Sequence, residues 1–304
     1  MRTRSSCGAS PTALDEFLAN GRCEFIKEYA QPFAMFAVAD VLGVPEEDHG
    51  RFRQFFGMSQ PPGMVNQSDV RDDEPLNKLD SLDEWFSAYI EDRRANPRED
   101  VLTRIAQATF SDGSTPTVTD VMLLASNLFA AGQETTVRLL AYSLQKLGED
   151  PELQQRLRED RSAIPNFVEE ALRFESPIKG EFRLAKRTVE VGGVTIPAGS
   201  TVMVINGAAN RDERKFECPA EFRVDREDAR EHIAFGHGIH FCIGAALARA
   251  EGRITVECML DRLDDIRISE EHHGPPDARK YRYAPTYMLR GLSELHLEFT
   301  PNGG

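Results

Sequence analysis

The sequence predicts a mainly α-helical protein with small β-sheets (α+β class). Two observations lead to this fold class. Apolar residues recur at helical spacing through most of the chain, including a long, mostly apolar segment from 119 to 147, and this period is the main sequence signal for helices. By contrast, only residues 181–205 and the last forty residues show the short alternation and turn residues that are typical of strands.

Length and composition indicate one globular domain. No Pro/Gly/Ser linker or low-complexity run divides the 304 residues, so we expect a single domain, 1–304. With 36 basic and 50 acidic residues the formal charge is −14, which argues against a nucleic-acid binder. The five scattered cysteines favour a reducing compartment, and we expect a cytoplasmic protein. No apolar run has the length of a membrane span, so we expect no membrane association.

The first hundred residues contain helical patterns separated by turn signals. Gly43 ends the first of them and Pro45 suits the first turn of the second. A segment without any period, 59–73, is expected to be a mobile loop or lid. The expected helices span residues 13–43 with a break near Pro32, 45–58, 76–94 and 100–110.

The long helix, 119–147, carries an unusual sequence, with Ala131, Gly132, Glu134 and Thr135 close together. Glycine and a β-branched alcohol are poor choices for a helix interior. Because Thr135 follows Ala131 by four residues, its hydroxyl can bond the Ala131 carbonyl and open a groove for a small ligand. Glu134 is then placed to relay protons. The alternative is a close helix–helix contact made by small residues, with Glu134 on the surface.

Two further helices, 150–161 and one that starts at Pro165, follow the long helix. The second contains Glu170 and Arg173, an E-x-x-R pattern that places both side chains on one face. Taken alone, such a pair is an ordinary surface contact worth about 0.2–0.5 kcal/mol.

Short strands are expected after the E-x-x-R helix and at the end of the chain. A loop-rich segment, 207–226, lies between them. His272 and His273 are expected in a solvated turn. The expected strands lie within 181–200, at 201–205, 266–269, 282–289 and 295–299.

Residues 232–251, HIAFGHGIHFCIGAALARAE, join a glycine-containing loop to a helix expected at 243–254. Cys242 stands at the junction, where a helix N-terminus favours a thiolate and the glycines let the backbone approach the sulfur. Three interpretations are open: a thiolate ligand of haem iron, part of a zinc site with His237 and His240, or a buried structural cysteine.

This loop reads F-G-x-G-x-H-x-C-x-G and resembles the haem-binding loop of cytochromes P450. The long helix with its Glu–Thr pair, the E-x-x-R helix and the loop occur in the order typical of that family, and the resemblance extends over almost the whole chain. It is most similar to bacterial members such as the camphor-hydroxylase group. The residues that carry the motif are Phe235, Gly236, Gly238, His240, Cys242 and Gly244.

The resemblance implies a cofactor, haem b, and a task for each matching residue. Cys242 is the axial thiolate to the iron, and His240 and Arg183 bond the haem propionates. Phe235 and Gly236 belong to the cofactor-binding loop. The small pair Ala131 and Gly132 lies over the haem, and Thr135 with Glu134 delivers protons to dioxygen.

The resemblance also implies a function, a haem-thiolate monooxygenase that inserts one atom of O2 into a small apolar organic substrate. Electrons are expected from a separate ferredoxin or flavodoxin, with Arg249 and Arg253 as candidate docking residues, and we expect a monomer. The Glu170–Arg173 pair is completed by a residue within 210–212 or by Arg223 or Arg226.

The family's N-terminal strands, substrate-covering loop and proximal helix find no match before residue 13. The expectation is therefore an N-terminally truncated P450 fold, and the alternative function is a non-catalytic haem-binding or inactive truncated P450 fragment.

Overall fold

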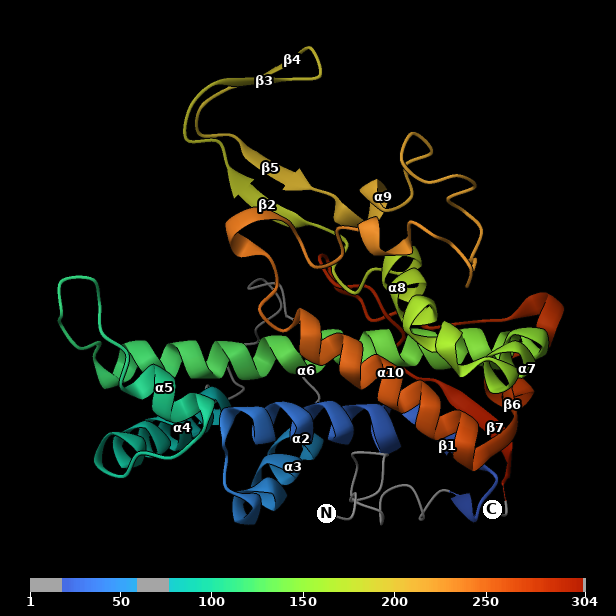
Figure 1. Ribbon diagram of the computed structural model, residues 1–304, viewed down its shortest axis with the longest axis horizontal. Coiled ribbons are helices and arrows are strands. Elements are labelled where there is room, and N and C mark those ends of the chain that lie inside the picture. Colours follow the sequence, from blue (N-terminus) through green and yellow to red (C-terminus); the bar gives the residue numbers. More distant parts are fainter. Residues whose placement is uncertain (1–17, 59–76, 303–304) are drawn as a thin grey trace.

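The computed structural model describes residues 18–58 and 77–302 of the chain. One helix, α6 (Val118–Glu149), runs through the middle of the molecule, and most other elements are arranged around it (Figure 1). Three helices pack along it: α2 (Gln31–Leu42), α4 (Asn77–Ala95) and α10 (Ala245–Arg262). A capping box between Thr117 and Asp120 fixes where α6 begins.

The other helices are shorter and occur in the order expected from their start and stop signals. Asp150 caps the N-terminus of α7, and Gly43 ends α2 with a φ of 94°, a left-handed conformation that suits glycine. These elements are a π-helical turn Ile26–Ala30, a 3₁₀ turn Glu46–Asp48, α3 (His49–Met58), α5 (Val101–Ala106), α7 (Pro151–Glu159), α8 (Ile164–Phe174), α9 (Asn206–Ala209) and α11 (Glu270–His273).

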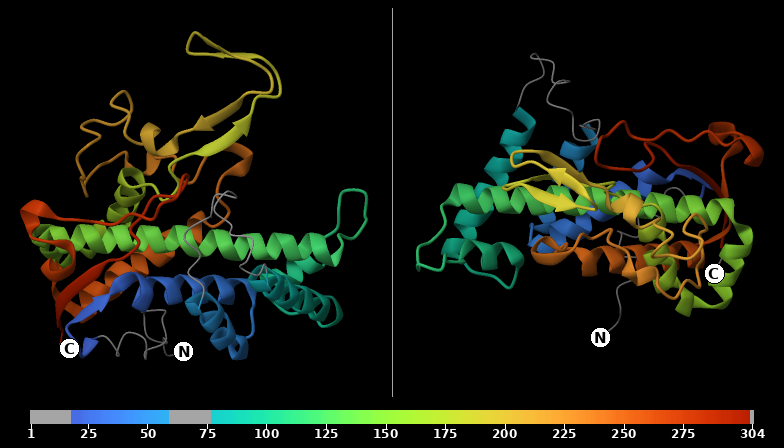
Figure 2. Two further views of the ribbon diagram at one scale, coloured as in Figure 1. Left: turned by 180° about the vertical axis from the view of Figure 1, so that it is seen from behind. Right: turned by 90° about the horizontal axis from the view of Figure 1, so that it is seen from above.

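The strands form small antiparallel sheets. One contains β1 (Arg22–Glu24), β7 (His296–Pro301) and β6 (Leu263–Ile268), in the order β1-β7-β6. A second pairs β2 (Glu181–Leu184) with β5 (Thr201–Val204). A third is the hairpin of β3 (Val189–Val191) and β4 (Val194–Ile196), which projects away from the helices (Figures 1 and 2).

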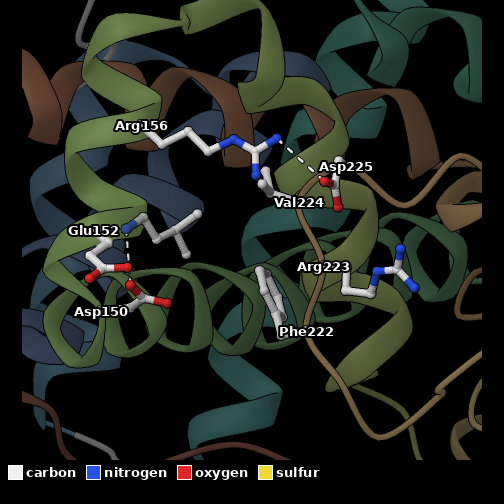
Figure 3. A pocket seen from close by; sticks show the side chains of 8 residues that line it. Asp150, Glu152, Arg156, Phe222, Arg223, Val224 and Asp225 are labelled. Atoms are coloured by element: carbon white, nitrogen blue, oxygen red, sulfur yellow. Dashed lines mark hydrogen bonds and ion pairs between the residues drawn. The ribbon is translucent and has the colours of Figure 1, made fainter.

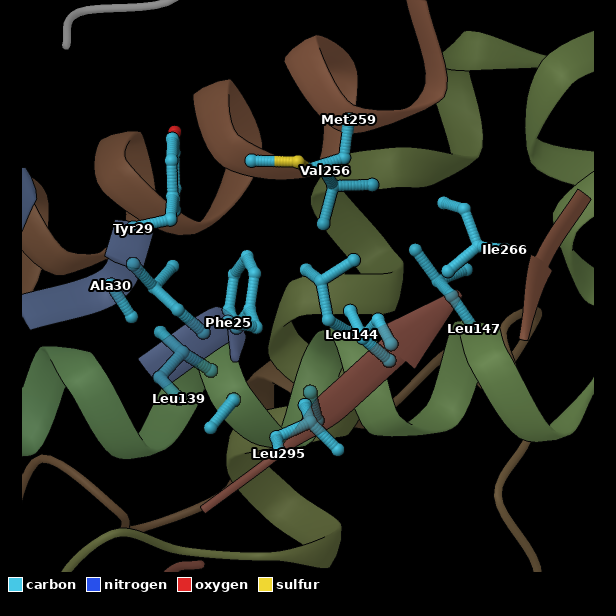
Figure 4. Close-up of a cluster of buried hydrophobic side chains, with 14 of the residues drawn as sticks. Phe25, Tyr29, Ala30, Leu139, Leu144, Leu147, Val256, Met259, Ile266 and Leu295 are labelled. Carbon is cyan, nitrogen blue, oxygen red and sulfur yellow. The ribbon is translucent and has the colours of Figure 1, made fainter. Parts of the chain in front are cut away.

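Two apolar clusters flank α6. The larger joins the C-terminal half of α6 to α8, α10 and the three-stranded sheet, with Leu144, Met259 and Leu295 near its centre (Figure 4). The smaller joins the N-terminal half of α6 to α2, α3 and α4, and the rings of Phe52 on α3 and Phe129 on α6 lie 5.2 Å apart. The apolar side chains of α6 therefore pack against neighbouring elements along much of its length.

Most expected helices are confirmed, but some expectations are wrong. The segment 13–43 is not one broken helix, since Arg22–Glu24 forms a strand that pairs with residues 296–298. The strand expected at 282–289 is absent, and Tyr283 and Leu289 make only isolated bridges there. The loop expected at 59–73 lies outside the described residues.

His273 also departs from expectation. It is buried in α11, not solvated, and its Nε2 accepts the backbone N–H of His296 at 2.9 Å. Among the helices in 18–58 and 77–302, none combines the length and the apolar character needed to cross a membrane.

Candidate functional site

The cysteine loop holds Cys242 just before α10. The Cys242 amide donates to the Phe235 carbonyl at 2.9 Å, and Gly244 is the N-cap of the helix. A Cβ added at Gly244 would lie 3.8 Å from Cys242 Sγ, which shows that the sulfur lies beside this N-terminus. The thiol is free and exposed. The interpretation of Cys242 as a buried structural cysteine is therefore wrong.

Two glycines give the loop its shape. Gly236 and Gly238 have φ values of 71° and 77°, a region that side-chain-bearing residues rarely adopt. Gly236 also lies close to β2, because a Cβ built there would be 3.5 Å from Glu181 Oε1. The loop thus requires glycine at these positions and is placed against the β2–β5 sheet.

The Glu–Thr pair of α6 has the geometry that its spacing predicts. Thr135 Oγ1 donates to the Ala131 carbonyl at 2.8 Å, and the Glu134 carboxylate forms an ion pair with Arg138. Arg138 itself is buried. The buried Arg138 guanidinium therefore holds the Glu134 carboxylate in place. The Thr135 hydroxyl donates its proton to Ala131, so its oxygen remains free to accept a hydrogen bond.

Residues on one side of α6 are uncovered. The exposed positions Leu123, Asn127 and Ala131 follow one another at intervals of four and lead to Thr135, so they share one face. This face ends at the hydroxyl of Thr135.

Gly132 has a packing role in this helix. A Cβ at Gly132 would lie 2.8 Å from Val38 Cγ2 on α2, so the absent side chain allows α2 and α6 to approach each other. This contact is the close helix–helix packing that the sequence offered as the alternative explanation. It accounts for Gly132, whereas Ala131 is exposed.

The E-x-x-R pair is a buried cluster. Glu170 and Arg173 are joined by two hydrogen bonds, and Arg226 Nε donates to Glu170 Oε1 at 3.1 Å. The backbone N–H of Arg223 donates to the same oxygen at 2.9 Å. Of the third members that the sequence left open, Arg226 supplies the side chain. The cluster ties α8 to the segment that leads into the cysteine loop.

Arg183 lies on β2 and His240 lies within the cysteine loop, and the two side chains share no contact partner among the described residues. Arg183 is half-exposed on β2, where it forms an ion pair with Glu181 and donates to the Phe182 carbonyl at 2.9 Å. His240 is exposed in the 3₁₀ turn Gly238–His240. Both side chains are accessible to a ligand.

Two buried carboxyl groups were missed by the sequence analysis. Glu251 of α10 accepts a hydrogen bond from Thr136 of α6 at 3.1 Å, and burial raises its pKa to about 8 although that hydrogen bond opposes the shift. Glu169 contacts His232, Arg230 and Arg249. Glu169 directly precedes Glu170, but only Glu170 belongs to the E-x-x-R pattern. The sequence therefore gave no signal for Glu169 itself.

A separate pocket lies away from these residues. It has a volume of about 310 Å³, lies between α7 and the segment 222–225, and includes an ion pair of Arg156 with Asp225 at 3.6 Å (Figure 3). None of its lining residues belongs to the cysteine loop or to the Glu–Thr pair. In the described part of the chain no group of three or more His, Cys, Asp and Glu side chains is arranged to hold a metal ion, so the zinc alternative for Cys242 has no ligand set there.

The chain is similar in sequence to proteins of one known family. The sequence model of the cytochrome P450 family matches residues 74–280. The chain is 34% identical over 287 residues to cytochrome P450 107B1 of Saccharopolyspora erythraea, covering 93% of this chain and 66% of that protein. Cytochrome P450 monooxygenase PikC of Streptomyces venezuelae is also 34% identical, with 94% and 66% covered.

A solved structure shows the same fold. Mycobacterium marinum cytochrome P450 CYP150A6 in the substrate-free form shares 55% sequence identity with a TM-score of 0.87, over 96% of this chain and 68% of that one. The chain therefore belongs to the cytochrome P450 family and has the P450 fold. It spans about 66% of the length of the curated relatives just named.

Proposed function

We propose that this chain carries the cofactor site of a haem-thiolate monooxygenase, with Cys242 as the axial ligand of haem b iron. The observation that supports this most is the placement of a free, exposed thiol at the N-terminus of α10, in a glycine loop, within a chain of the P450 family. The helix N-terminus favours a negative sulfur, and thiolate is a suitable ligand for haem iron.

The residues around Cys242 fit a flat, largely apolar group that carries carboxylates. Ile239, Phe241 and Ile243 flank the sulfur with exposed fractions of 97%, 52% and 87%. Large apolar side chains left open in this way are typical of a surface that a ligand or another segment covers. Arg183 and His240 are exposed nearby and supply donors for carboxylates.

Each remaining residue has a proposed task on this chain. When bound, haem supplies reductive activation of O2, so that one oxygen atom enters the substrate and the other leaves as water. Phe235 accepts the Cys242 N–H and Gly236 shapes the loop. On α6, the exposed Ala131 leaves room for a ligand, and Gly132 lets α6 lie close to α2.

Thr135 and Glu134 form the proposed proton-delivery pair. The Thr135 hydroxyl donates to Ala131, so its oxygen can accept a proton and pass on its own. Glu134, the residue before Thr135, forms an ion pair with Arg138. Their proposed role is to hold and transfer protons on the substrate side of α6.

The proposed substrate is a small apolar organic molecule, because Leu123 and Ala131 on the uncovered face of α6 are apolar. The proposed electron donor is a separate ferredoxin or flavodoxin, the kind of partner that membership of this family implies. We further propose a cytoplasmic monomer with one domain.

The experiment is a reconstitution with haem, a ferredoxin chain and NADH. Product formation and oxygen use are measured together with terpenoids, fatty acids and aromatics, after a ligand-shift screen has selected binders. Consumption of oxygen and NADH in step with formation of an oxygenated product supports the proposal. A spectral shift without product over all binders contradicts it.

A second candidate is a haem-binding protein without turnover. This candidate uses the same free, exposed thiol of Cys242 and differs only in whether turnover follows haem binding. The same reconstitution separates the two, since this candidate shows haem uptake and ligand shifts but no oxygenated product.

A further inference from the structure

We propose that Glu169 is a positioning residue for the cysteine loop, acting through His232 at the start of the loop and Arg249 on α10. The inference rests on the proposed function of Cys242 and adds a second bracing point beside the Glu170 cluster. Glu169 and Glu170 are neighbours on α8 with separate sets of partners.

Glu169 is at the centre of a compact charge cluster. Its side chain is 2% exposed, and it is reached by His232 Nε2 at 3.1 Å and by Arg249 through Nε at 2.8 Å and Nη2 at 3.2 Å. Arg230 adds an Nε contact at 3.2 Å from the segment before the loop. One carboxylate therefore joins α8, the entry to the loop and α10.

His232 fixes the entry to the loop. Its Nδ1 accepts the backbone N–H of Ala234 at 3.1 Å, so Nε2 carries the proton and donates it to Glu169. The next residue, Ile233, donates its N–H to Asn210 Oδ1 at 2.7 Å. The backbone leading into the loop is thus held at successive residues.

Arg249 reaches the loop from the opposite side. Its guanidinium lies 4.6 Å from the centre of the Phe235 ring while it is bound to Glu169. Phe235 accepts the Cys242 N–H through its carbonyl. A continuous series of contacts consequently runs from Glu169 through Arg249 and Phe235 to the backbone N–H of Cys242.

The cluster is stable as a charged unit. Burial acts to raise the pKa of Glu169, but the hydrogen bonds from His232 and Arg249 outweigh it and lower that pKa to about 2. Removing one cationic partner from a buried carboxylate costs free energy. Breaking the contact of Glu169 with Arg249 is therefore unfavourable.

This geometry changes the expectation for Arg249. As a candidate docking residue it needs a free guanidinium, but the guanidinium is engaged by Glu169 and covered by Phe235 on one face. Arg253, one turn further along α10, is half-exposed and pairs only with Glu257 in the described part of the chain. Arg253 therefore serves as the matched control.

The test is hydrogen exchange by mass spectrometry on the full, haem-free chain, comparing wild type with Glu169→Gln, Arg249→Lys and Arg253→Lys. In Glu169→Gln we expect peptides over 232–242 to exchange about tenfold faster or more, the effect of losing charge-assisted hydrogen bonds on a local opening. Peptides of β6 and β7 should exchange as in wild type.

Arg249→Lys separates charge from shape. Lysine keeps the charge but lacks the planar group that lies over Phe235, so we expect faster exchange at 235–242 without a change at 232–234. Arg253→Lys should match wild type. Unchanged exchange of the loop in both Glu169→Gln and Arg249→Lys overturns the proposal, as does acceleration spread evenly over the chain.

A second readout uses the haem-loaded protein. In Glu169→Gln the ferrous carbon monoxide complex should show a smaller fraction of the red-shifted, thiolate-type Soret band than wild type at equal haem content. If wild type itself lacks that band, the proposed function of Cys242 fails, while the exchange experiment still decides whether Glu169 positions the loop.

Discussion

Glu170 accepts two hydrogen bonds from Arg173, from Nε at 2.6 Å and from Nη2 at 2.8 Å, and neither side chain is exposed to solvent. Arg173 Nη1 also donates to the carbonyls of Asn210 and Pro219. A pair that is worth little on a surface is buried here, and it connects α8 to the irregular segment that leads toward the cysteine loop.

Removing Arg173 should therefore destabilise the protein strongly. We expect Arg173→Ala to lower the free energy of unfolding by about 3–5 kcal/mol, because it leaves Glu170 buried with one cation fewer. Urea unfolding followed by circular dichroism measures this. The control, Arg253→Ala, breaks a half-exposed pair and should cost less than about 1 kcal/mol. Equal effects of the two substitutions would contradict the buried-cluster interpretation.

Glu251 should make stability fall as the pH rises. Its ordinary pKa is 4.5 and burial raises it to about 8 in the folded protein, against the hydrogen bond from Thr136. Between these values the unfolded chain has released the proton and the folded chain retains it. The unfolded state then binds fewer protons, so the free energy of unfolding decreases with pH across this window.

Glu251→Gln removes this proton linkage at similar volume. The variant should match wild type near pH 5 and be more stable by roughly 3–5 kcal/mol at pH 8, since each pKa unit corresponds to about 1.4 kcal/mol. Urea midpoints at pH 5 and pH 8 test it. A difference between variant and wild type that stays constant over this range would show that Glu251 titrates normally.

Thr135 should control how oxygen use is coupled to product. Thr135→Ala removes the hydroxyl that donates to Ala131, and we expect oxygen and NADH use to continue with a several-fold lower product yield, in line with a general-acid contribution. Thr135→Ser keeps the hydroxyl and should retain coupling. Unchanged coupling in Thr135→Ala rules out the proton-delivery role.

Gly132→Ala should destabilise the fold although alanine is normally the better helix former. The new Cβ would lie 2.8 Å from Val38 Cγ2, and overpacking of this kind costs about 1–3 kcal/mol. In a Val38→Ala background the same substitution should become neutral or stabilising by up to about 1 kcal/mol. A double-mutant cycle from urea unfolding measures the coupling. No coupling between the two positions would remove the packing explanation for Gly132.

Local signals in the sequence predicted much of the fold. Gly43 and Pro45 mark a real helix end and start, and the spacing of Ala131 and Thr135 predicted their hydrogen bond. These features depend on residues a few positions apart, which a sequence displays directly. The order of motifs around Cys242 pointed to the family for the same reason.

Long-range features could not be predicted in this way. Strand β1 depends on residues 296–298, more than 270 positions away, and its three residues carry no period. In the sequence Arg226 was one of several candidates for the Glu170 cluster, and only the fold shows that its Nε donates to Glu170 Oε1. Glu169 and Glu251 look like ordinary charged residues on helices, and only packing shows that they are buried.

The ferrous carbon monoxide difference spectrum of the haem-reconstituted protein tests the central claim, that Cys242 is the ligand of haem iron. Wild type and Cys218→Ser, which alters an exposed thiol outside the loop, should both give the red-shifted, thiolate-type Soret band. Cys242→Ser should lose that band even where haem remains bound. A thiolate-type band that persists in Cys242→Ser, or that is absent from wild type with haem bound, would contradict the account.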